Sequence, residues 1–323
     1  MNICTVGTSW ITDSFIESAK YVKDINITDV YSRSADKAEK FAEKHGIKNY
    51  YCNFSDMLCD KTIDGVYVAS PNLCHYEQSK AILESGKNVI CEKPAAVTTS
   101  QLSELYDLAE KKGLIFLEAM KSMHSDGLQI IKDALPSLGD VRSASIDFSQ
   151  LSSKYPAYKK GELPNIFNPK MCTGALMDLG VYCVYFALEL FGEPKKVISH
   201  SDFLSSGADS SGTLIFAYGD KTVTVTYSKT ANGFLGSRIL GANGALSIKS
   251  VSKLIGIKKH ENDGTVSVLY PDVDENIIMS KEIQSFYDFV AGDRLDYYDY
   301  CKKLSLAACR IMEQVRKDNN FGF

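Results

Sequence analysis

Residues 86–98 read GKNVICEKPAAVT, and this stretch decides how the chain is interpreted. The apolar run at 89–91 is typical of a short buried strand, and Lys93 follows where that strand ends. Pro94 fixes φ and removes a backbone donor, so the strand stops and the chain turns. Ligands of an open parallel sheet bind outside the carboxyl ends of its strands. The sequence therefore predicts that Lys93 faces a ligand, although a lysine before a proline, taken alone, is more often part of an ordinary surface turn.

The composition is that of a globular protein, with 45% hydrophobic and 24% charged residues. A chain of 323 residues exceeds one ordinary core, so two domains are expected. The net charge of -4, without a basic stripe, argues against a nucleic-acid partner. The N-terminus has neither the basic region nor the cleavage site of a signal peptide, and the longest uncharged apolar run, 181–188, is too short for a bilayer. We expect a cytoplasmic protein without a membrane partner.

The nine cysteines show no paired spacing and no CxxC motif. This pattern favours reduced thiols in a cytoplasm and argues against a zinc or redox centre. No metal site is expected.

The first 120 residues alternate strand and helix signals with short connections, and glycines end several of the helices. This rhythm predicts an α/β domain over residues 1–120, a doubly wound Rossmann sheet that is parallel and covered by helices on both faces. Strands are expected at 3–6, 25–31, 65–69, 89–91 and 114–118, and helices through Phe15, Ile16 and Ala19 and at 34–45, 75–85 and 99–112.

Beyond about residue 140 the strands alternate apolar and polar residues, as in 213–217 and 222–227, with a hairpin turn at Gly219-Asp220 between them. Such alternation predicts a large, mostly antiparallel open sheet with one buried face. An apolar helix is expected at 176–191, and closing helices at 283–290 and 300–315. Residues 121–323 are therefore assigned to a C-terminal α+β domain for substrate binding and dimerisation.

Four segments in this order resemble the Gfo/Idh/MocA family of nicotinamide-dependent oxidoreductases. They are VGTSWIT at 6–12, the block from SPN to EKP at 70–94, NIFNPKMCTGALMDLGVY at 165–182, and the closing helices. The resemblance covers essentially the whole chain. It is strongest to the branch of dimeric dihydrodiol dehydrogenases and sugar reductases, in which D-x-G-x-Y appears as it does here from Asp178 to Tyr182. It implies a homodimer or higher homo-oligomer, formed through the open face of the C-terminal sheet.

The first glycine-rich turn departs from the Rossmann fingerprint G-x-G-x-x-G, because Ser9 and Thr12 occupy its second and third glycine positions. Gly7 can still make the tight turn, and the amides after it can still point at a pyrophosphate. Trp10, the only tryptophan, is either a core anchor for the following helix or a wall of the cofactor cleft. The loop residues expected to bind the cofactor are Gly7, Thr8, Ser9, Trp10 and Ile11.

The end of the second strand bears on the choice of cofactor. Sites that prefer NAD place a carboxylate there, whereas this strand continues into Ser32 and Arg33. A serine hydroxyl can bond a 2′-phosphate, and an arginine can pair with it and stack on adenine. NADP is therefore favoured and NAD remains possible. The alternative is that Arg33 is only a solvated residue at a helix start.

The resemblance implies that the turn Ser70-Pro71-Asn72 runs beside the nicotinamide ribose. Its alternative is a proline turn with an Asx bond, followed by a histidine at a helix start. The residues predicted to contact the cofactor here are Ser70, Pro71, Asn72, His75, Glu92 and Lys93.

Asp178 and Tyr182 are four residues apart, so on a helix they share a face. An aspartate within an apolar run needs a partner, and Lys93 is the candidate. Reduction of a carbonyl by hydride needs a proton donor and a positive charge near the developing alkoxide. The resemblance implies that Tyr182 or Lys93 delivers the proton while Asp178 orients the donor. The alternative is a helix N-cap aspartate beside a core tyrosine.

Two segments bear on the substrate. His124 lies where many relatives carry a Trp-Arg-Phe-x-Pro-like segment, and it is either a substrate contact or an exposed loop histidine. Residues 152–172, with Asn165 and Phe167, are expected to form a loop over the cleft whose polar residues suit a polyol. We expect an NADP(H)-dependent oxidoreductase acting on the carbonyl/alcohol pair of a sugar, polyol or dihydrodiol. The alternative is a sensor or regulator that binds the cofactor without turnover, which the altered glycine motif would allow.

Overall fold

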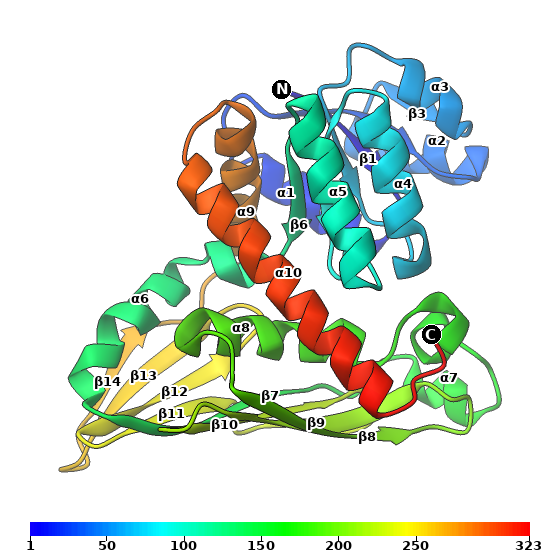
Figure 1. Ribbon diagram of the computed structural model, residues 1–323. Coiled ribbons are helices and arrows are strands. Elements are labelled where there is room, and N and C mark those ends of the chain that lie inside the picture. Colours follow the sequence, from blue (N-terminus) through cyan, green and yellow to red (C-terminus); the bar gives the residue numbers. More distant parts are fainter. The chain divides into compact units, whose positions relative to one another are not determined.

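The computed structural model describes all 323 residues, and the chain divides into two compact units (Figure 1). The first unit comprises Met1–Met120 and Glu275–Leu306, and the second comprises Lys121–Asp274 and Ala307–Phe323. The sequence pattern predicts one C-terminal domain for residues 121–323. Residues 275–306 belong instead to the first unit, because α9 (Glu275–Val290) shares its apolar core.

The first unit is built on a six-stranded parallel sheet with strand order β3-β2-β1-β4-β5-β6. The order reverses between β1 and β4, which is the switch point where such sheets bind ligands. The doubly wound parallel sheet that the alternation predicted is confirmed. Its strands are β1 (Asn2–Val6), β2 (Asn26–Tyr31), β3 (Asn49–Tyr51), β4 (Gly65–Val68), β5 (Asn88–Glu92) and β6 (Phe116–Ala119). Its helices are α1 (Trp10–Ala19), α2 (Ala35–His45), α3 (Phe54–Cys59), α4 (Asn72–Glu84), α5 (Thr99–Lys112), α9 (Glu275–Val290) and the first part of α10 (Leu295–Asp318).

The core of the first unit explains why α9 belongs to it. Phe15 of α1 stacks on Tyr67 of β4 with ring centroids 3.7 Å apart. Phe286 and Phe289 of α9 are buried in the same apolar cluster. Burying each of these rings stabilises the folded unit by about 2 kcal/mol, because apolar surface is removed from water. The helix therefore packs where its apolar face is covered, irrespective of its distance along the chain.

The elements β3 and α3 are the two that the alternation did not reveal. β3 has three residues, all at least partly exposed, and α3 has six. Segments of this length are too short to show a hydrophobic period.

The second unit contains an eight-stranded sheet with strand order β14-β13-β12-β11-β7-β10-β9-β8. Every neighbouring pair is antiparallel except β7 and β10, so the prediction of a mostly antiparallel sheet is confirmed. Figure 1 shows α8 (Val181–Phe191) lying along one face of this sheet. The strands are β7 (Val141–Ser149), β8 (Lys196–Phe203), β9 (Asp209–Ala217), β10 (Thr222–Ser228), β11 (Ser237–Gly241), β12 (Gly244–Ser250), β13 (Ile255–Glu261) and β14 (Val266–Tyr270).

The expected helix at 176–191 is two elements. A π-helical turn, η5 (Leu176–Gly180), precedes α8. Together with the residues before it, this segment forms a stretch, Pro169–Phe191, that is long and apolar enough to cross a membrane by length and composition alone. Most of it is buried inside the protein, 89% of the most apolar window, as in the core helix of a globular unit.

Candidate functional site

Gly7 directly follows β1. It is the one glycine of the fingerprint that remains, and its backbone geometry explains why a glycine is needed there. Its φ is 116°, a value that residues with a side chain rarely adopt. A Cβ atom there would lie 2.6 Å from the Ala69 carbonyl oxygen. The Gly7 amide donates to the Tyr31 carbonyl over 3.1 Å. The turn thus brings the ends of β1, β2 and β4 together at the switch point of the sheet.

Helix α1 begins directly after this turn. Ser9 is its N-cap, with extended backbone and no capping bond from its side chain, and Thr12 and Asp13 donate to the Ser9 carbonyl over 3.0 and 3.1 Å. The first amides of a helix have no intrahelical acceptor and attract anions. Thr12 is fully buried, so the residue at the third glycine position packs into the core.

Trp10 is 70% exposed, so the interpretation of this residue as a core anchor is wrong. The other interpretation, a wall of the cofactor cleft, stays a prediction. Thr8 and Ile11 beside it are half-buried.

Arg33 is exposed at the end of β2, next to a short hydrogen-bonded turn. The Ser34 amide donates to the Ser32 hydroxyl over 3.5 Å, and the Ser34 side chain caps α2 by accepting from the Lys37 amide over 3.4 Å. Ser34, and not Arg33, therefore caps α2. No acidic side chain follows β2 directly, and the next one along the chain is Asp36 in the first turn of α2.

His75 of α4 connects the two turns that were predicted to border the cofactor. Its Nε2 lies 2.7 Å from the Ser70 carbonyl oxygen and its Nδ1 lies 2.9 Å from the Pro94 carbonyl oxygen. Burial lowers the pKa of His75, while its two carbonyl partners oppose that shift. The ring is 1% exposed and both nitrogens lie within hydrogen-bond distance of backbone oxygens, so the prediction of a direct contact with the cofactor is not supported and the side chain links the two turns.

The turn around Lys93 is held from several sides within the first unit. The peptide bond between Lys93 and Pro94 is cis. Glu118 of β6 accepts from the Ala95 amide over 2.8 Å, immediately after the proline. The Glu92 carboxylate, immediately before the lysine, accepts from the Tyr67 hydroxyl over 2.6 Å. The backbone that carries Lys93 is therefore fixed on both sides.

Asp178 lies in the middle of η5 and forms an ion pair with Lys229, which follows β10. The Asp178 side chain is 32% exposed and that of Lys229 is 10% exposed. Lys229 is thus a partner of Asp178 that the sequence pattern does not indicate, since the pattern points to Lys93. No local signal marks Lys229, because 51 residues separate it from Asp178. The proposed pairing with Lys93 stays a prediction.

Tyr182 lies in the first turn of α8 and is 9% exposed. Its ring meets Phe148 of β7 edge to face at 5.7 Å between centroids. Asp178 is not the N-cap of either helical element, so that alternative is wrong for the aspartate. The π-helical turn between the two residues means that the four-residue rule of an α-helix does not apply to them directly.

Asp209, at the start of β9, supports the backbone of the same turn. Its Oδ2 accepts from the Leu176 amide over 2.6 Å, and the residue is 1% exposed. Burial raises the pKa of Asp209 to about 7, against the effect of the amide bond. A Cβ atom on Gly174 would lie 1.8 Å from Asp209 Oδ1, so only glycine fits above the carboxyl group.

The predicted substrate residues differ in their surroundings. His124 is half-buried at the end of η1 (Lys121–His124), and Asn165 is exposed at the start of η3 (Asn165–Phe167). Phe167 has no exposed surface and packs against Tyr155 and Tyr158, with centroids 5.8 and 5.2 Å away. The prediction that Phe167 contacts the substrate is therefore corrected, because its ring forms the core of the 152–172 segment.

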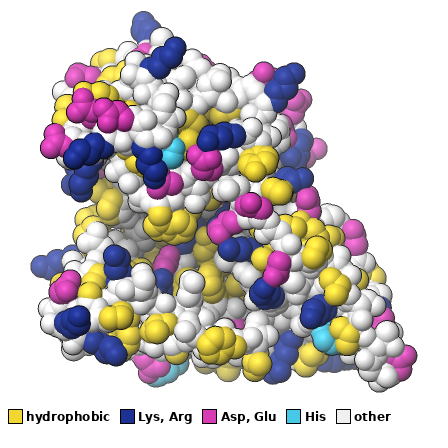
Figure 2. Space-filling view, turned by 180° about the vertical axis from the view of Figure 1, so that it is seen from behind, with side chains coloured by type: hydrophobic (Ala, Val, Ile, Leu, Met, Phe, Trp, Pro, Cys, Tyr) yellow, Lys and Arg dark blue, Asp and Glu magenta, His cyan; other side chains and the backbone are white.

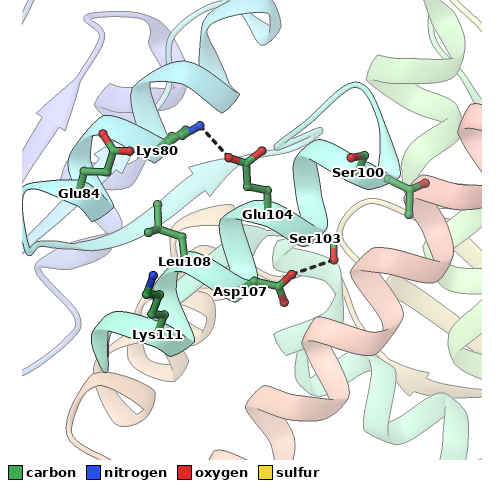
Figure 3. Close-up of a pocket in the computed structure, with 9 residues that line it drawn as sticks. Lys80, Glu84, Ser100, Ser103, Glu104, Asp107, Leu108 and Lys111 are labelled. Atoms are coloured by element: carbon green, nitrogen blue, oxygen red, sulfur yellow. Dashed lines mark hydrogen bonds and ion pairs between the residues drawn. The ribbon is translucent and has the colours of Figure 1, made fainter.

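The structure also contains a groove of about 750 Å³ between α4 and α5, shown in Figure 3. Lys80 pairs there with Glu104 over 2.7 Å, and Ser103 donates to Asp107 over 3.4 Å. None of the predicted site residues lines it. On the face shown in Figure 2, acidic and basic side chains are interspersed and no large patch of one sign appears.

Both parts of the chain match family models. Residues 1–120 match the oxidoreductase family with an NAD-binding Rossmann fold, and residues 135–247 match the GFO/IDH/MocA C-terminal domain. Among curated relatives, the scyllo-inositol 2-dehydrogenase (NADP(+)) IolU of Bacillus subtilis is 35% identical, covering 97% of this chain and 95% of the relative. The trans-1,2-dihydrobenzene-1,2-diol dehydrogenase of Xenopus tropicalis is 30% identical, covering 77% and 74%.

Solved structures share the fold. The 3-ketoreductase KijD10 of Actinomadura kijaniata, in complex with NADP and TDP-benzene, has a TM-score of 0.84 at 20% identity, covering 98% of this chain and 97% of that chain. An oxidoreductase of Agrobacterium radiobacter in complex with NAD+, L-tartaric acid and magnesium has a TM-score of 0.81 at 15% identity, covering 100% and 97%. The two family matches and the IolU relationship confirm the resemblance seen in the sequence. The chain belongs to the Gfo/Idh/MocA family and is an NAD(P)-dependent oxidoreductase.

Proposed function

We propose that this enzyme is an NADP(H)-dependent dehydrogenase or reductase of a polyol, acting on one carbonyl/alcohol pair. The observation that carries this proposal is the 35% identity to an NADP-dependent scyllo-inositol dehydrogenase along nearly the whole of both chains. The dihydrodiol dehydrogenases match over a shorter part at lower identity. A polyol is therefore the first substrate class to test, and a dihydrodiol the second.

The switch point of the first unit fits a dinucleotide. Gly7 leaves the turn without a side chain where a Cβ atom would collide, and the amides of Ser9 and Trp10 begin α1 directly behind it. Ser32 and Arg33 would hold the 2′-phosphate through charge-assisted hydrogen bonds. Thr8 and Ile11 would complete the loop around the pyrophosphate. Ser70, Pro71, Asn72 and Glu92 would border the nicotinamide ribose, in the turns that His75 holds together.

NADPH, when bound, supplies the hydride. The residues of the chain then have to stabilise the alkoxide that develops and give it a proton. We assign this work to Lys93 and Tyr182, either of which can donate the proton, with Asp178 orienting the donor. His124 and Asn165 would contact the hydroxyl groups of the substrate. The alternative of a sensor without turnover is disfavoured, because a sensor has no need of Lys93, Asp178 and Tyr182 as groups for proton transfer.

The protein's setting is part of the proposal. A cytoplasmic location agrees with the nine free cysteines. A homodimer would cover the face of the second sheet on which Ile198 of β8 lies opposite Ile215 of β9, 48% and 38% exposed.

The direct test is turnover by the purified protein, followed by nicotinamide absorbance. scyllo-Inositol, myo-inositol and a trans-dihydrodiol would each be offered with NADP+ and with NAD+. We expect NADP+-dependent oxidation of an inositol, abolished in Lys93→Met with NADPH binding retained. Lys111→Met, at an exposed lysine of α5, is the control. Nicotinamide binding without turnover of any polyol or diol would support the sensor instead, and full activity of Lys93→Met would remove Lys93 from the mechanism.

A further inference from the structure

We propose that Lys229 is a positioning residue for the reaction, which holds the Asp178 carboxylate in place through their ion pair. This inference rests on the proposed function, because it assigns Lys229 a role through Asp178. The two side chains belong to the same unit and are joined directly.

The backbone of Lys229 is fixed on both sides of the strand that leads to it. β9 and β10 pair in register with Ser228 opposite Ser211, and the Lys229 amide continues the ladder by donating to the Ser210 carbonyl over 2.8 Å. The Lys229 carbonyl accepts from the Ser152 amide over 2.9 Å. The side chain therefore starts from a rigid end of the sheet and not from a mobile loop.

The same strand end holds the turn that carries Asp178 by a second contact. Asp209, at the first position of β9, accepts from the Leu176 amide in the backbone of η5. Lys229 holds the carboxylate two residues further along that turn. One pair of strands thus fixes both the backbone and the side chain of η5. Two independent contacts from one rigid edge indicate that the direction of the Asp178 carboxylate matters.

Burial gives the ion pair its importance. The Lys229 side chain is 10% exposed, so its charge needs a partner, and Asp178 supplies one. With Lys229 present, Asp178 is a fixed acceptor that can orient a neighbouring hydroxyl or ammonium donor. Without Lys229 the carboxylate loses the contact that ties it to the end of β10, and a misplacement of about 1 Å can cost about 10²-fold in rate.

The experiment compares Lys229→Met with Lys229→Arg and with a matched control. The control is Lys221→Met, since Lys221 precedes the other end of β10 and is ion-paired with Asp220 in the hairpin turn. We expect Lys229→Met to lower kcat by about 10²-fold, with NADPH affinity and the thermal unfolding midpoint close to the wild type. Lys229→Arg should restore a large part of kcat, and Lys221→Met should have the wild-type rate.

A double-mutant cycle then separates positioning from a merely structural role. If Lys229 acts through Asp178, adding Lys229→Met to Asp178→Asn causes no further loss of kcat. Independent losses that multiply would overturn the inference, as would wild-type kcat in Lys229→Met. If Lys229→Met does not fold, the comparison of Lys229→Arg with Lys229→Gln decides the matter, and equal rates in these two would overturn it.

The outcomes distinguish the inference from the function beneath it. An active wild type with an inactive Asp178→Asn and an unaffected Lys229→Met overturns the inference alone. An active Asp178→Asn overturns the assigned role of Asp178 and the inference with it. A wild type that turns over no polyol or diol overturns both.

Discussion

At the glycine-rich turn, the conformation of one residue, Gly7, sets what the sequence can be. Gly7 is required because the Ala69 carbonyl occupies the space that a side chain would need. Ser9 replaces the second glycine at an N-cap where its backbone is extended, so this position needs no special conformation. The loss of two glycines from the fingerprint is thus compatible with the turn, because among its three glycine positions only that of Gly7 has a positive φ.

Arg33→Ala should weaken NADPH binding far more than NADH binding. The 2′-phosphate loses a charge-assisted hydrogen bond worth about 1.5–3 kcal/mol, or about 10- to 100-fold in Kd, while NADH has no such group. Titration of nicotinamide fluorescence measures both constants. Arg142→Ala, at an exposed arginine of β7, is the control and should change neither constant. Equal losses for the two cofactors would show that Arg33 does not read the phosphate.

Asp209 should make the stability of the protein depend on pH. Burial raises its pKa in the folded state to about 7, whereas the unfolded value is about 3.9. Between these values the folded state holds a proton that the unfolded state releases. The stabilisation is therefore complete below about pH 4 and is lost as the pH rises toward 7, by at most about 1.4 kcal/mol per pH unit.

Asp209→Asn removes this titration and so isolates it. Urea unfolding of both proteins at several pH values from about 5 to about 8 should show the wild type losing stability relative to the variant up to about pH 7, and a constant difference above it. Parallel curves over the whole range would mean that the Asp209 carboxyl group ionises normally.

At the level of secondary-structure elements, the turn that carries Lys93 is held by contacts from several elements. α4 contributes His75 between the turns at Ser70 and Pro94, and β6 contributes Glu118 at the Ala95 amide. The Glu118 carboxylate also accepts from the Ser305 hydroxyl of α10. Elements from both ends of the sequence therefore support the turn that carries the proposed proton donor.

His75→Leu should destabilise the first unit and lower kcat more than it raises KM. It leaves the buried carbonyl group that accepts from the His75 ring N–H without its donor, which costs about 1–3 kcal/mol. Urea unfolding and steady-state kinetics measure the two effects. The control is His200→Leu, whose side chain is 80% exposed, and it should change neither. A loss of stability with unchanged kcat would restrict His75 to a structural role.

At the scale of the whole molecule, the proposed dimer would cover exposed apolar side chains on the outer face of the second sheet. Ile198 and Ile215 are register partners on β8 and β9, and Leu240 of β11 is also 39% exposed. Single exposed apolar residues are ordinary, whereas neighbours on one sheet face favour an interface.

Ile215→Lys should convert the proposed dimer into a monomer, because it places an unpaired charge in an apolar interface. Light scattering coupled to size-exclusion chromatography measures the mass. Ile277→Lys, at an isoleucine of α9 with 40% exposure, is the matched control and should stay dimeric. A monomeric wild type would remove the dimer from the proposal, and a dimeric Ile215→Lys would move the interface elsewhere.

Most elements of the first unit and the family of the chain can be predicted from the sequence alone. The signals are local. Strands and helices alternate, and a glycine directly follows α2 and another follows α5, so each element can be recognised from a few residues. The turn at Lys93 and the motifs that carry the family resemblance are short segments that can be recognised in the same way.

Only the tertiary structure decided which distant residues meet. It paired Asp178 with Lys229, moved α9 into the first unit, buried Phe167 and turned His75 from a ligand contact into a link between two turns. These outcomes depend on where the chain returns after many residues, and on which apolar faces and buried charges find cover there. Periodicity and turn residues describe a segment's own preferences, whereas burial and ion pairing belong to the partners that the fold brings to it.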